Sequence, residues 1–270
     1  MSASPEILSY LKQLRLPADD SHKGQNGKLL LIGGSELFHA ASKWSLDIAS
    51  QIVDMVFYSS VPGNNELIKE AKGNFWNGIV IERADIDQYA QEADCILIGP
   101  GMIRSQETAD VTNQILRHYR DKRIVLDAGA LQMLDPSLLH KNCILTPHAR
   151  ELERVLSKID DDSEVAMQKL LQKEVLVVLK NQQDTISTLD KELIVTGGNA
   201  GMTKGGTGDV LAGLIAALYC THDQWTAAVA GSYFNKRAGD ELYQEVGPYF
   251  NATQLAAQLP KTIWRELQSL

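Results

Sequence analysis

The stretch from Thr196 to Tyr219, TGGNAGMTKGGTGDVLAGLIAALY, is the part of this sequence around which the rest is expected to be organised. Six glycines lead the backbone to Asp209, and the apolar residues 210–218 that follow predict a buried helix. The sequence therefore predicts a glycine loop that runs directly into the N-terminus of a helix.

Such a loop is suited to holding an anion. Glycines let successive N–H groups converge on one point, and the first helical turn adds unpaired N–H groups and the positive end of the helix dipole. Asp209 at this point is either a helix cap or a base beside a phosphate. The stretch is not a Walker A loop, because Lys204 precedes the last glycines, and it is not a dinucleotide fingerprint, because Leu211 stands where the third glycine belongs.

Upstream of this loop, short apolar segments alternate with helical ones. The expected strands are residues 28–32, 53–59, 78–81, 95–98, 123–126, 143–145 and 175–179, and the clearest intervening helices are 38–51, 106–119 and 150–156. A helix over 5–14, a hairpin of 185–189 with 192–195, and helices over 209–219, 224–241 and 252–259 complete the chain, with Pro260 ending or kinking the last helix. This pattern predicts a single α/β domain over 1–270, with a mostly parallel, doubly wound sheet and helices on both faces.

Composition excludes several classes of partner. The 270 residues carry a net charge of −8, which argues against a nucleic acid. No apolar run reaches the roughly 20 residues that a membrane span needs. Three widely spaced cysteines predict neither disulfides nor a zinc site, so we expect a soluble cytoplasmic protein.

The residues that follow each expected strand are the candidate site, because ligands of open parallel sheets bind at the carboxyl ends of the strands. Each candidate also has a structural explanation. Asp127 and His148 could each begin a helix, Glu151 could complement a helix dipole, and Lys180 could be solvated. The segments concerned are Gly33-Gly34-Ser35, Gly99-Pro100-Gly101, Asp127-Ala128-Gly129, Thr146-Pro147-His148 and Lys180-Asn181.

Taken together, these motifs resemble the NAD(P)H-hydrate dehydratase family, which has the ribokinase-like fold. The resemblance spans about residues 24–260, and its most specific pieces are Thr146-Pro147-His148 with Glu151, and the segment 205–213. It implies a metabolite-repair enzyme that uses ADP or ATP to restore hydrated NADH or NADPH, by phosphoryl transfer to the ring hydroxyl and then loss of phosphate.

The resemblance also implies a role for each matching residue. Asp209 would be the catalytic base near the hydrated ring, and the N–H groups of Gly206, Thr207 and Gly208 would form the anion hole. Glu151 would help to place Mg²⁺ through water. The remaining assignments are Lys180, Asn181, Gln182, Gln183, Asp184 and Gly208 for the adenine nucleotide, and Ala40, Gly101 and His148, with Asp209, for the substrate. A homo-oligomer is also expected.

Several positions depart from the family pattern. His39 precedes Ala40 where glycine is usual, Ile103 and Asn181 replace common glycines, and Gly129 replaces the second acid of Asp-Ala-Asp. Residues 52–56 also lack the usual Gly-x-Gly turn. The departures gather on the expected substrate side, whereas the segment 205–209 is intact.

Two alternatives therefore stay open. The chain could be a small-molecule, carbohydrate-like kinase of the same fold that releases its phosphorylated product. It could also be a non-catalytic nucleotide-binding relative.

Overall fold

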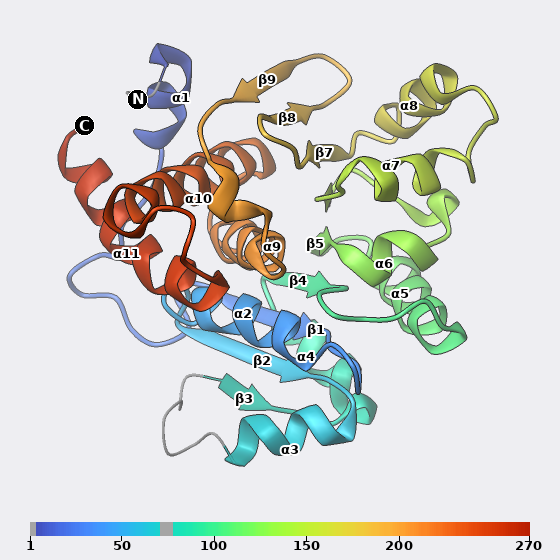
Figure 1. Ribbon diagram of the computed structural model, residues 1–270. Helices are drawn as coiled ribbons and strands as arrows, with labels where there is room; N and C mark the ends of the chain where they lie inside the picture. The colour runs from blue at the N-terminus through green and yellow to red at the C-terminus, as the bar shows by residue number, and fades with distance from the viewer. Residues whose placement is uncertain (1–3, 71–77) are drawn as a thin grey trace.

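The apolar segments form one nine-stranded sheet in the computed structural model, which describes residues 4–70 and 78–270 (Figure 1). The strand order is β3-β2-β1-β4-β5-β6-β7-β8-β9. Strands β1 to β7 are parallel, and β8 and β9 continue the sheet antiparallel. The mostly parallel sheet predicted from the sequence is confirmed.

The strands are short, as is usual for a sheet covered on both faces. Their bounds are β1 Lys28–Ile32, β2 Met55–Ser59, β3 Gly78–Val80, β4 Cys95–Ile98, β5 Arg123–Leu126, β6 Cys143–Leu145, β7 Leu176–Leu179, β8 Asp184–Ser187 and β9 Glu192–Val195. The helices are α1 Pro5–Leu11, α2 His39–Ala49, α3 Pro62–Glu70, α4 Ile86–Glu92, α5 Gln106–His118, α6 Ala128–Met133, α7 Ala149–Leu156, α8 Ser163–Leu171, α9 Thr207–Tyr219, α10 Gln224–Val246 and α11 Ala252–Gln268.

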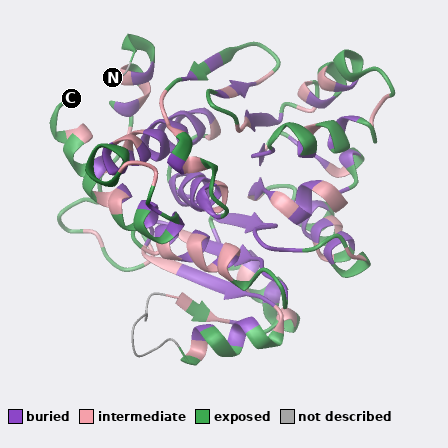
Figure 2. Cartoon of the chain, in the orientation of Figure 1, coloured by how far each residue is buried: buried purple, intermediate pink, exposed green. Residues whose placement is uncertain are grey.

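Two hydrophobic cores lie on the two faces of the sheet. In β1, Leu29 and Leu31 face a core with α2, α9, α10 and α11, whereas Leu30 and Ile32 face a core with α4 to α8. Because successive side chains of a strand point to opposite faces, a continuous apolar run such as Lys28–Ile32 is required when both faces are covered. Figure 2 shows this burial along the central strands and α9.

Three helices were not predicted. α3, α4 and α8 carry many polar residues on their exposed faces, and each buries only two or three side chains. Their apolar signal is therefore weak, and tertiary packing decides their conformation.

The last helix also differs from the expectation, because α11 continues through Pro260 to Gln268. A proline inside a helix leaves the carbonyl four residues earlier without its donor. Here Gln51 Nε2 donates to the Ala256 carbonyl at 3.5 Å, from outside the helix. The predicted end of the helix at 259 is therefore wrong, whereas the alternative of a kink at Pro260 stays a prediction.

The strand order reverses between β1 and β4, which are neighbours although β2 and β3 lie between them in sequence. Such a switch point opens a crevice at the carboxyl ends of the strands, where ligands of open α/β sheets bind.

No helix within residues 4–70 and 78–270 is long and apolar enough to cross a membrane.

Candidate active site

The glycine loop enters α9 through a conformation that only glycine adopts readily. Gly206 is the N-cap of α9 and has a φ of +99°. A Cβ there would lie 2.4 Å from the Trp44 ring, so both the backbone and the neighbouring ring require glycine. Thr207 fixes the loop from the other side, since its hydroxyl donates to the Met202 carbonyl at 2.7 Å.

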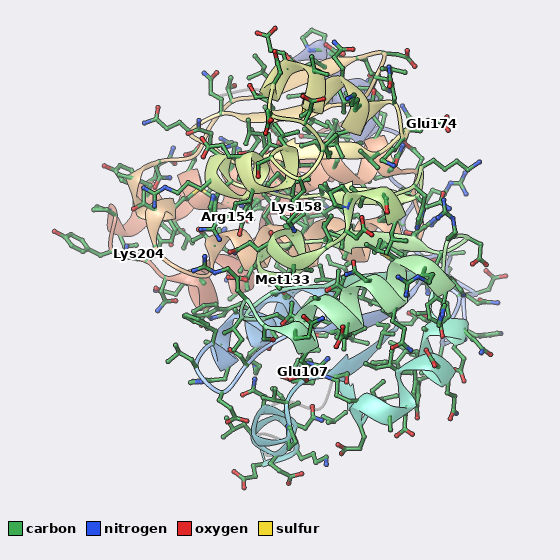
Figure 3. The ribbon with its side chains drawn as sticks, turned by 90° about the vertical axis from the view of Figure 1, so that its right-hand side faces the viewer. Glu107, Met133, Arg154, Lys158, Glu174 and Lys204 are labelled. Atoms are coloured by element: carbon green, nitrogen blue, oxygen red, sulfur yellow. The ribbon has the colours of Figure 1, made fainter. Side chains whose placement is uncertain are left out.

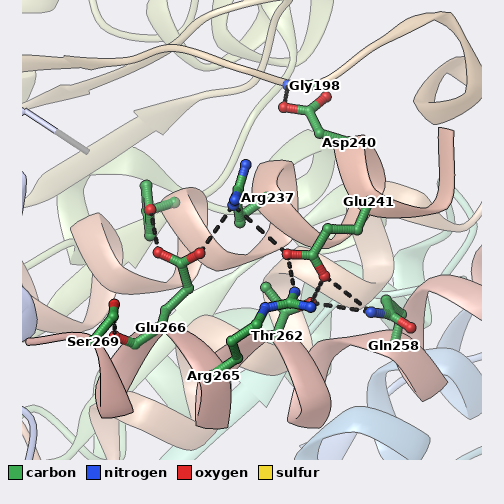
Figure 4. Close-up of polar contacts among 10 residues, drawn as sticks. Gly198, Arg237, Asp240, Glu241, Gln258, Thr262, Arg265, Glu266 and Ser269 are labelled. Carbon is green, nitrogen blue, oxygen red and sulfur yellow. Dashed lines mark hydrogen bonds and ion pairs between the residues drawn. The ribbon is translucent and has the colours of Figure 1, made fainter. Parts of the chain in front are cut away.

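The base of the loop is anchored to α10 (Figure 4). The Asp240 carboxylate accepts from the Gly198 N–H at 3.2 Å and from Asn199 Nδ2 at 3.1 Å. Beside it, Arg237 bonds to Glu266 at 2.9 Å and lies 3.6 Å from Glu241, so that ion pairs join α10 to α11. These contacts hold the loop against a rigid helix pair.

Asp209 is the third residue of α9 and therefore is not its cap. Its carbonyl accepts from Ser45 Oγ of α2 at 2.8 Å. The two helices approach closely at Gly213, where a Cβ would lie 2.7 Å from the Ser45 carbonyl. Packing of α9 on α2 thus places the Asp209 carboxylate at the carboxyl edge of the sheet.

A buried charge cluster surrounds this position. Lys180, just after β7, bonds to Asp127, just after β5, at 2.6 Å, and its side chain is 17% exposed. Asp127 also accepts from the Thr146 hydroxyl at 2.9 Å. The carboxylates of Glu151 and Asp209 also act on the Lys180 ammonium through their charge, although only Asp127 is bonded to it.

The cluster changes the proton affinity of its members. Burial and the Asp127 carboxylate raise the pKa of Asp209 to about 7, although Lys180 acts in the opposite direction. The same two causes raise the pKa of Glu151. Burial alone lowers the pKa of Lys180, but the carboxylates more than offset it and the net direction is upward. Asp209 is therefore poised to exchange a proton near neutral pH.

Asp127 occupies the N-cap position of α6 but does not cap it, because its carboxylate makes no capping hydrogen bond and faces Lys180 and Thr146 instead. The next residue, Ala128, has a φ of +43°, and a Cβ on Gly129 would lie 2.1 Å from the Met102 carbonyl. This contact explains why the second acid of the family pattern is absent: the loop that follows β4 occupies its space.

His148 and Glu151 do form a helix cap. The Glu151 carboxylate accepts from the His148 N–H at 3.0 Å, and His148 Nδ1 accepts from the Glu151 N–H at 3.3 Å. The structural explanation of these two residues is thus correct, although it leaves a function open. The His148 side chain is 53% exposed, whereas that of Glu151 is buried beside Lys180.

The segment after Lys180 divides into an exposed part and a buried part. The side chains of Asn181, Gln182 and Gln183 face solvent. Asp184 is buried and is paired with Lys236 at 3.1 Å and with the Ser232 hydroxyl at 3.0 Å. Lys236 also donates to the Asn181 and Gln182 carbonyls, so this ion pair shapes the exposed segment.

At the switch point, the turns after β1 and β4 are packed on each other. Gly34 donates its N–H to the Pro100 carbonyl at 2.6 Å, and a Cβ on Gly101 would lie 2.4 Å from the Phe38 carbonyl. His39 begins α2 with its ring exposed, and Ala40 is partly buried. His39 therefore does not fill the crevice through packing.

Four residues that build the site were not predicted: Trp44, Ser45, Lys236 and Asp240. Each acts on a loop distant in sequence, and none belongs to a glycine or strand-end motif. Ser45 is the one with a possible sequence signal, because α2 and α9 both carry small residues that allow two helices to pack closely.

No group of three or more His, Cys, Asp or Glu side chains in the described ranges is arranged to hold a metal ion. A magnesium ion here would depend on ligands other than a protein cage.

Comparison with known proteins identifies the origin of this arrangement. The family described as NAD(P)H-hydrate dehydratase matches residues 29–261. A bifunctional NAD(P)H-hydrate repair enzyme from Methanocaldococcus jannaschii is 34% identical over 94% of this chain and 51% of its own length. An ADP-dependent (S)-NAD(P)H-hydrate dehydratase from Cenarchaeum symbiosum is 31% identical over 90% of this chain and 91% of its own length. The chain thus spans about half the length of some curated relatives it matches and most of another.

Solved structures confirm the ribokinase-like fold. A ribokinase-like superfamily protein from Enterococcus faecalis has a TM-score of 0.83 at 23% identity, covering 95% of this chain and 94% of its own. An ADP/ATP-dependent NAD(P)H-hydrate dehydratase from Bacillus subtilis has a TM-score of 0.76 at 24% identity, covering 97% of each chain.

Proposed function

Because this chain belongs to the NAD(P)H-hydrate dehydratase family, we propose that it restores hydrated NADH or NADPH at the expense of an adenine nucleotide. The observation that carries the proposal is the placement of Asp209, in the first turn of α9 behind a fixed glycine loop, with a pKa of about 7. A carboxylate of this pKa can accept a proton at neutral pH, and the adjacent N–H groups can receive a phosphoryl group.

In the first step, Asp209 accepts the proton of the ring hydroxyl. The hydroxyl oxygen forms a bond to the terminal phosphorus of the nucleotide, and the bond from that phosphorus to its bridging oxygen breaks. The N–H groups of Gly206, Thr207 and Gly208 hold the charge on the transferred group. Thr207 contributes only its N–H, because its hydroxyl is engaged with the loop carbonyls of Met202 and Lys204.

In the second step, the ring loses phosphate. The carbon–oxygen bond breaks and its electron pair leaves with the phosphate. The electron pair of a C–H bond on the neighbouring carbon restores the ring double bond, and water accepts the proton that is released. His148 at the exposed rim, with Ala40 and Gly101 at the switch point, lies on the side proposed for the substrate.

The adenine nucleotide is proposed to bind along the segment from Lys180 to Asp184. Lys180 lies near Gly208, since a Cβ there would be 3.3 Å from its Nζ, and its ammonium can meet a phosphate. Asn181, Gln182 and Gln183 are exposed for direct contact, whereas Asp184 acts by holding the segment to Lys236. ADP is the proposed donor, as the name of the Cenarchaeum symbiosum relative indicates, with ATP as an alternative.

The residues fit a magnesium ion carried by the nucleotide better than one held by the protein. Glu151 is a single buried carboxylate that is already engaged in the α7 cap. It would reach Mg²⁺ through water, while phosphate oxygens supply the direct ligands and the ion neutralises phosphate charge.

The decisive experiment is recovery of near-ultraviolet nicotinamide absorbance from NADH hydrate, with ADP, with ATP and with neither. We expect recovery only with a nucleotide, and a rate loss of about 100-fold or more in Asp209→Asn. The exposed Asp190→Asn is the matched control and should retain full activity. Formation of a stable phosphorylated product without recovery would replace the proposal with a kinase, and no turnover with retained nucleotide binding would indicate a non-catalytic relative.

We propose further that residues 1–270 form a single domain, that the protein acts in the cytoplasm, and that it assembles as a homo-oligomer. Its three cysteines are free and buried, which suits a reducing compartment. Exposed apolar side chains on α10 and α11, namely Tyr243, Val246 and Trp264, supply a surface for self-association. Light scattering after size exclusion tests this, and a monomer at micromolar concentration would refute it.

A further inference from the structure

Two adjacent glycines, Gly205 and Gly206, make the last peptide unit before α9 free to rotate. The N–H groups of Thr207 and Gly208 have directions that the helix fixes, because both residues lie inside α9. The direction of the Gly206 N–H depends instead on the backbone rotations of two residues without a Cβ. Apart from its chain neighbours, nothing in the described part of the chain lies within 4 Å of a Cβ on Gly205. A neighbour that contacts Gly206 is therefore needed to fix this N–H.

Trp44 of α2 supplies that contact. A Cβ on Gly206 would lie 2.4 Å from two carbons of the six-membered ring of Trp44 and 2.7 Å from the Ala252 Cβ. The indole and the first residue of α11 therefore lie against the α-carbon of Gly206. Glycine has other conformations of similar energy, so this contact, and not an intrinsic preference, selects the φ of +99°.

The indole of Trp44 is itself held at its other end. Its Nε1 donates to the hydroxyl of Thr253, the second residue of α11, at 3.0 Å. The next residue of α2, Ser45, bonds to the Asp209 carbonyl at 2.8 Å. The three helices α2, α9 and α11 are in mutual contact, as Figure 1 shows. One hydrogen bond between α2 and α11 thus fixes the ring that packs on the loop.

The turn that leads into α11 contacts the glycine loop at two earlier points. The Phe250 ring would lie 2.4 Å from a Cβ on Gly201, and the Pro248 carbonyl accepts from Lys204 Nζ. Lys204 lies at the edge of the molecule in Figure 3. Both contacts precede the two adjacent glycines. They hold the first part of the loop and leave the N-cap of α9 to the indole.

We propose that Trp44 is a positioning residue for phosphoryl transfer: the indole, held by Thr253, aims the Gly206 N–H at the charge that develops on the transferred group. The inference rests on the proposed function, in which this N–H belongs to the anion hole. Removing one donor from such a hole lowers kcat by about 100- to 1,000-fold. A loosened loop that keeps the N–H aimed for about a tenth of the time lowers kcat about tenfold.

Steady-state kinetics of Trp44→Ala with NADH hydrate and ADP test this role. We expect kcat to fall about tenfold and the KM for ADP to stay within about twofold, because the donor acts on charge that is present only in the transition state. A general loss of folded protein would not separate the two constants in this way. Nucleotide-dependent recovery in the wild type with an unchanged kcat in Trp44→Ala would overturn the inference and leave the proposed function intact.

The bond between Trp44 and Thr253 is tested by variants of an exposed residue, so the fold is retained. Thr253→Val removes the acceptor and should lower kcat about threefold or more, as expected for one hydrogen bond. Thr253→Ser keeps the hydroxyl and should restore the wild-type kcat. In Trp44→Phe, which lacks Nε1, Thr253→Val should have no further effect. An effect of Thr253→Val that persists in Trp44→Phe would show that the indole is not the connection.

The ¹⁵N heteronuclear NOE of glycine-labelled protein measures the order of the loop without turnover. We expect the NOE of Gly206 to decrease in Trp44→Ala, while that of Gly213, inside α9, stays the same. An unchanged NOE of Gly206 would refute the inference whether or not the protein is active. If the wild type shows no nucleotide-dependent recovery, the proposed function fails, and the NOE alone decides whether Trp44 positions this N–H.

Discussion

Asp209 should lower the stability of the folded protein at the pH where it serves as a base. Its pKa is about 7 in the folded state and 3.8 in the unfolded chain, a difference of about 3. Because the folded state holds the Asp209 proton more tightly, the contribution of Asp209 to the stability is greatest below pH 3.8 and is lost as the pH rises to 7. Each pH unit in that window removes about 1.4 kcal/mol.

The replacement Asp209→Asn removes this titration and keeps nearly the same volume. Between about pH 5.5 and pH 7, the wild type loses about 2 kcal/mol relative to the variant, and no further loss follows above pH 7. Water that reaches the partly exposed carboxylate screens the cluster, so we expect about 1–2 kcal/mol in practice.

Equilibrium urea unfolding of both proteins at about pH 5.5 and about pH 8.5 measures the difference. We expect the stability advantage of Asp209→Asn to increase with pH, while its turnover is lost at both. An advantage that is the same at both pH values would refute the raised pKa, and with it the reason for choosing Asp209 as the base. The Asp190→Asn control should show no pH-dependent difference.

Three further predictions concern Lys180, Gly129 and the buried cysteines. Lys180→Met removes the cation that lowers the pKa of Asp209, so the acidic limb of the pH–rate profile should move to higher pH; an unmoved limb would contradict this coupling. Gly129→Asp should lower the free energy of unfolding in urea by about 3 kcal/mol, because its Cβ meets the Met102 carbonyl. Gly205→Ala, where a Cβ has nothing within 4 Å, should be nearly neutral. Equal stabilities of the two variants would show that the loop around Met102 can move aside. Burial raises the pKa of Cys143 to about 12 and also raises that of Cys220, so thiol reagents should label these two cysteines only in unfolded protein, and rapid labelling of the native protein would argue against this burial.

The mostly parallel sheet and the position of the glycine loop could be predicted from local sequence signals. Short apolar runs such as 95–98, bounded by turn residues, favour strands that are covered on both faces. The glycine density before Asp209 indicates a loop with unusual backbone conformations, as Gly206 shows. These signals are local, because the backbone preferences of consecutive residues produce them. The polar helices α3, α4 and α8 gave no such signal and were missed.

Only the tertiary structure decided which of the strand-end residues act on one another. It showed that Asp127 faces Lys180 without capping α6, that His148 and Glu151 cap α7, and that Asp184 pairs with Lys236. It also showed that Ala256, freed by Pro260, finds a donor in Gln51. Each of these contacts joins residues from different elements, and their energies depend on distance and burial, which sequence spacing does not contain.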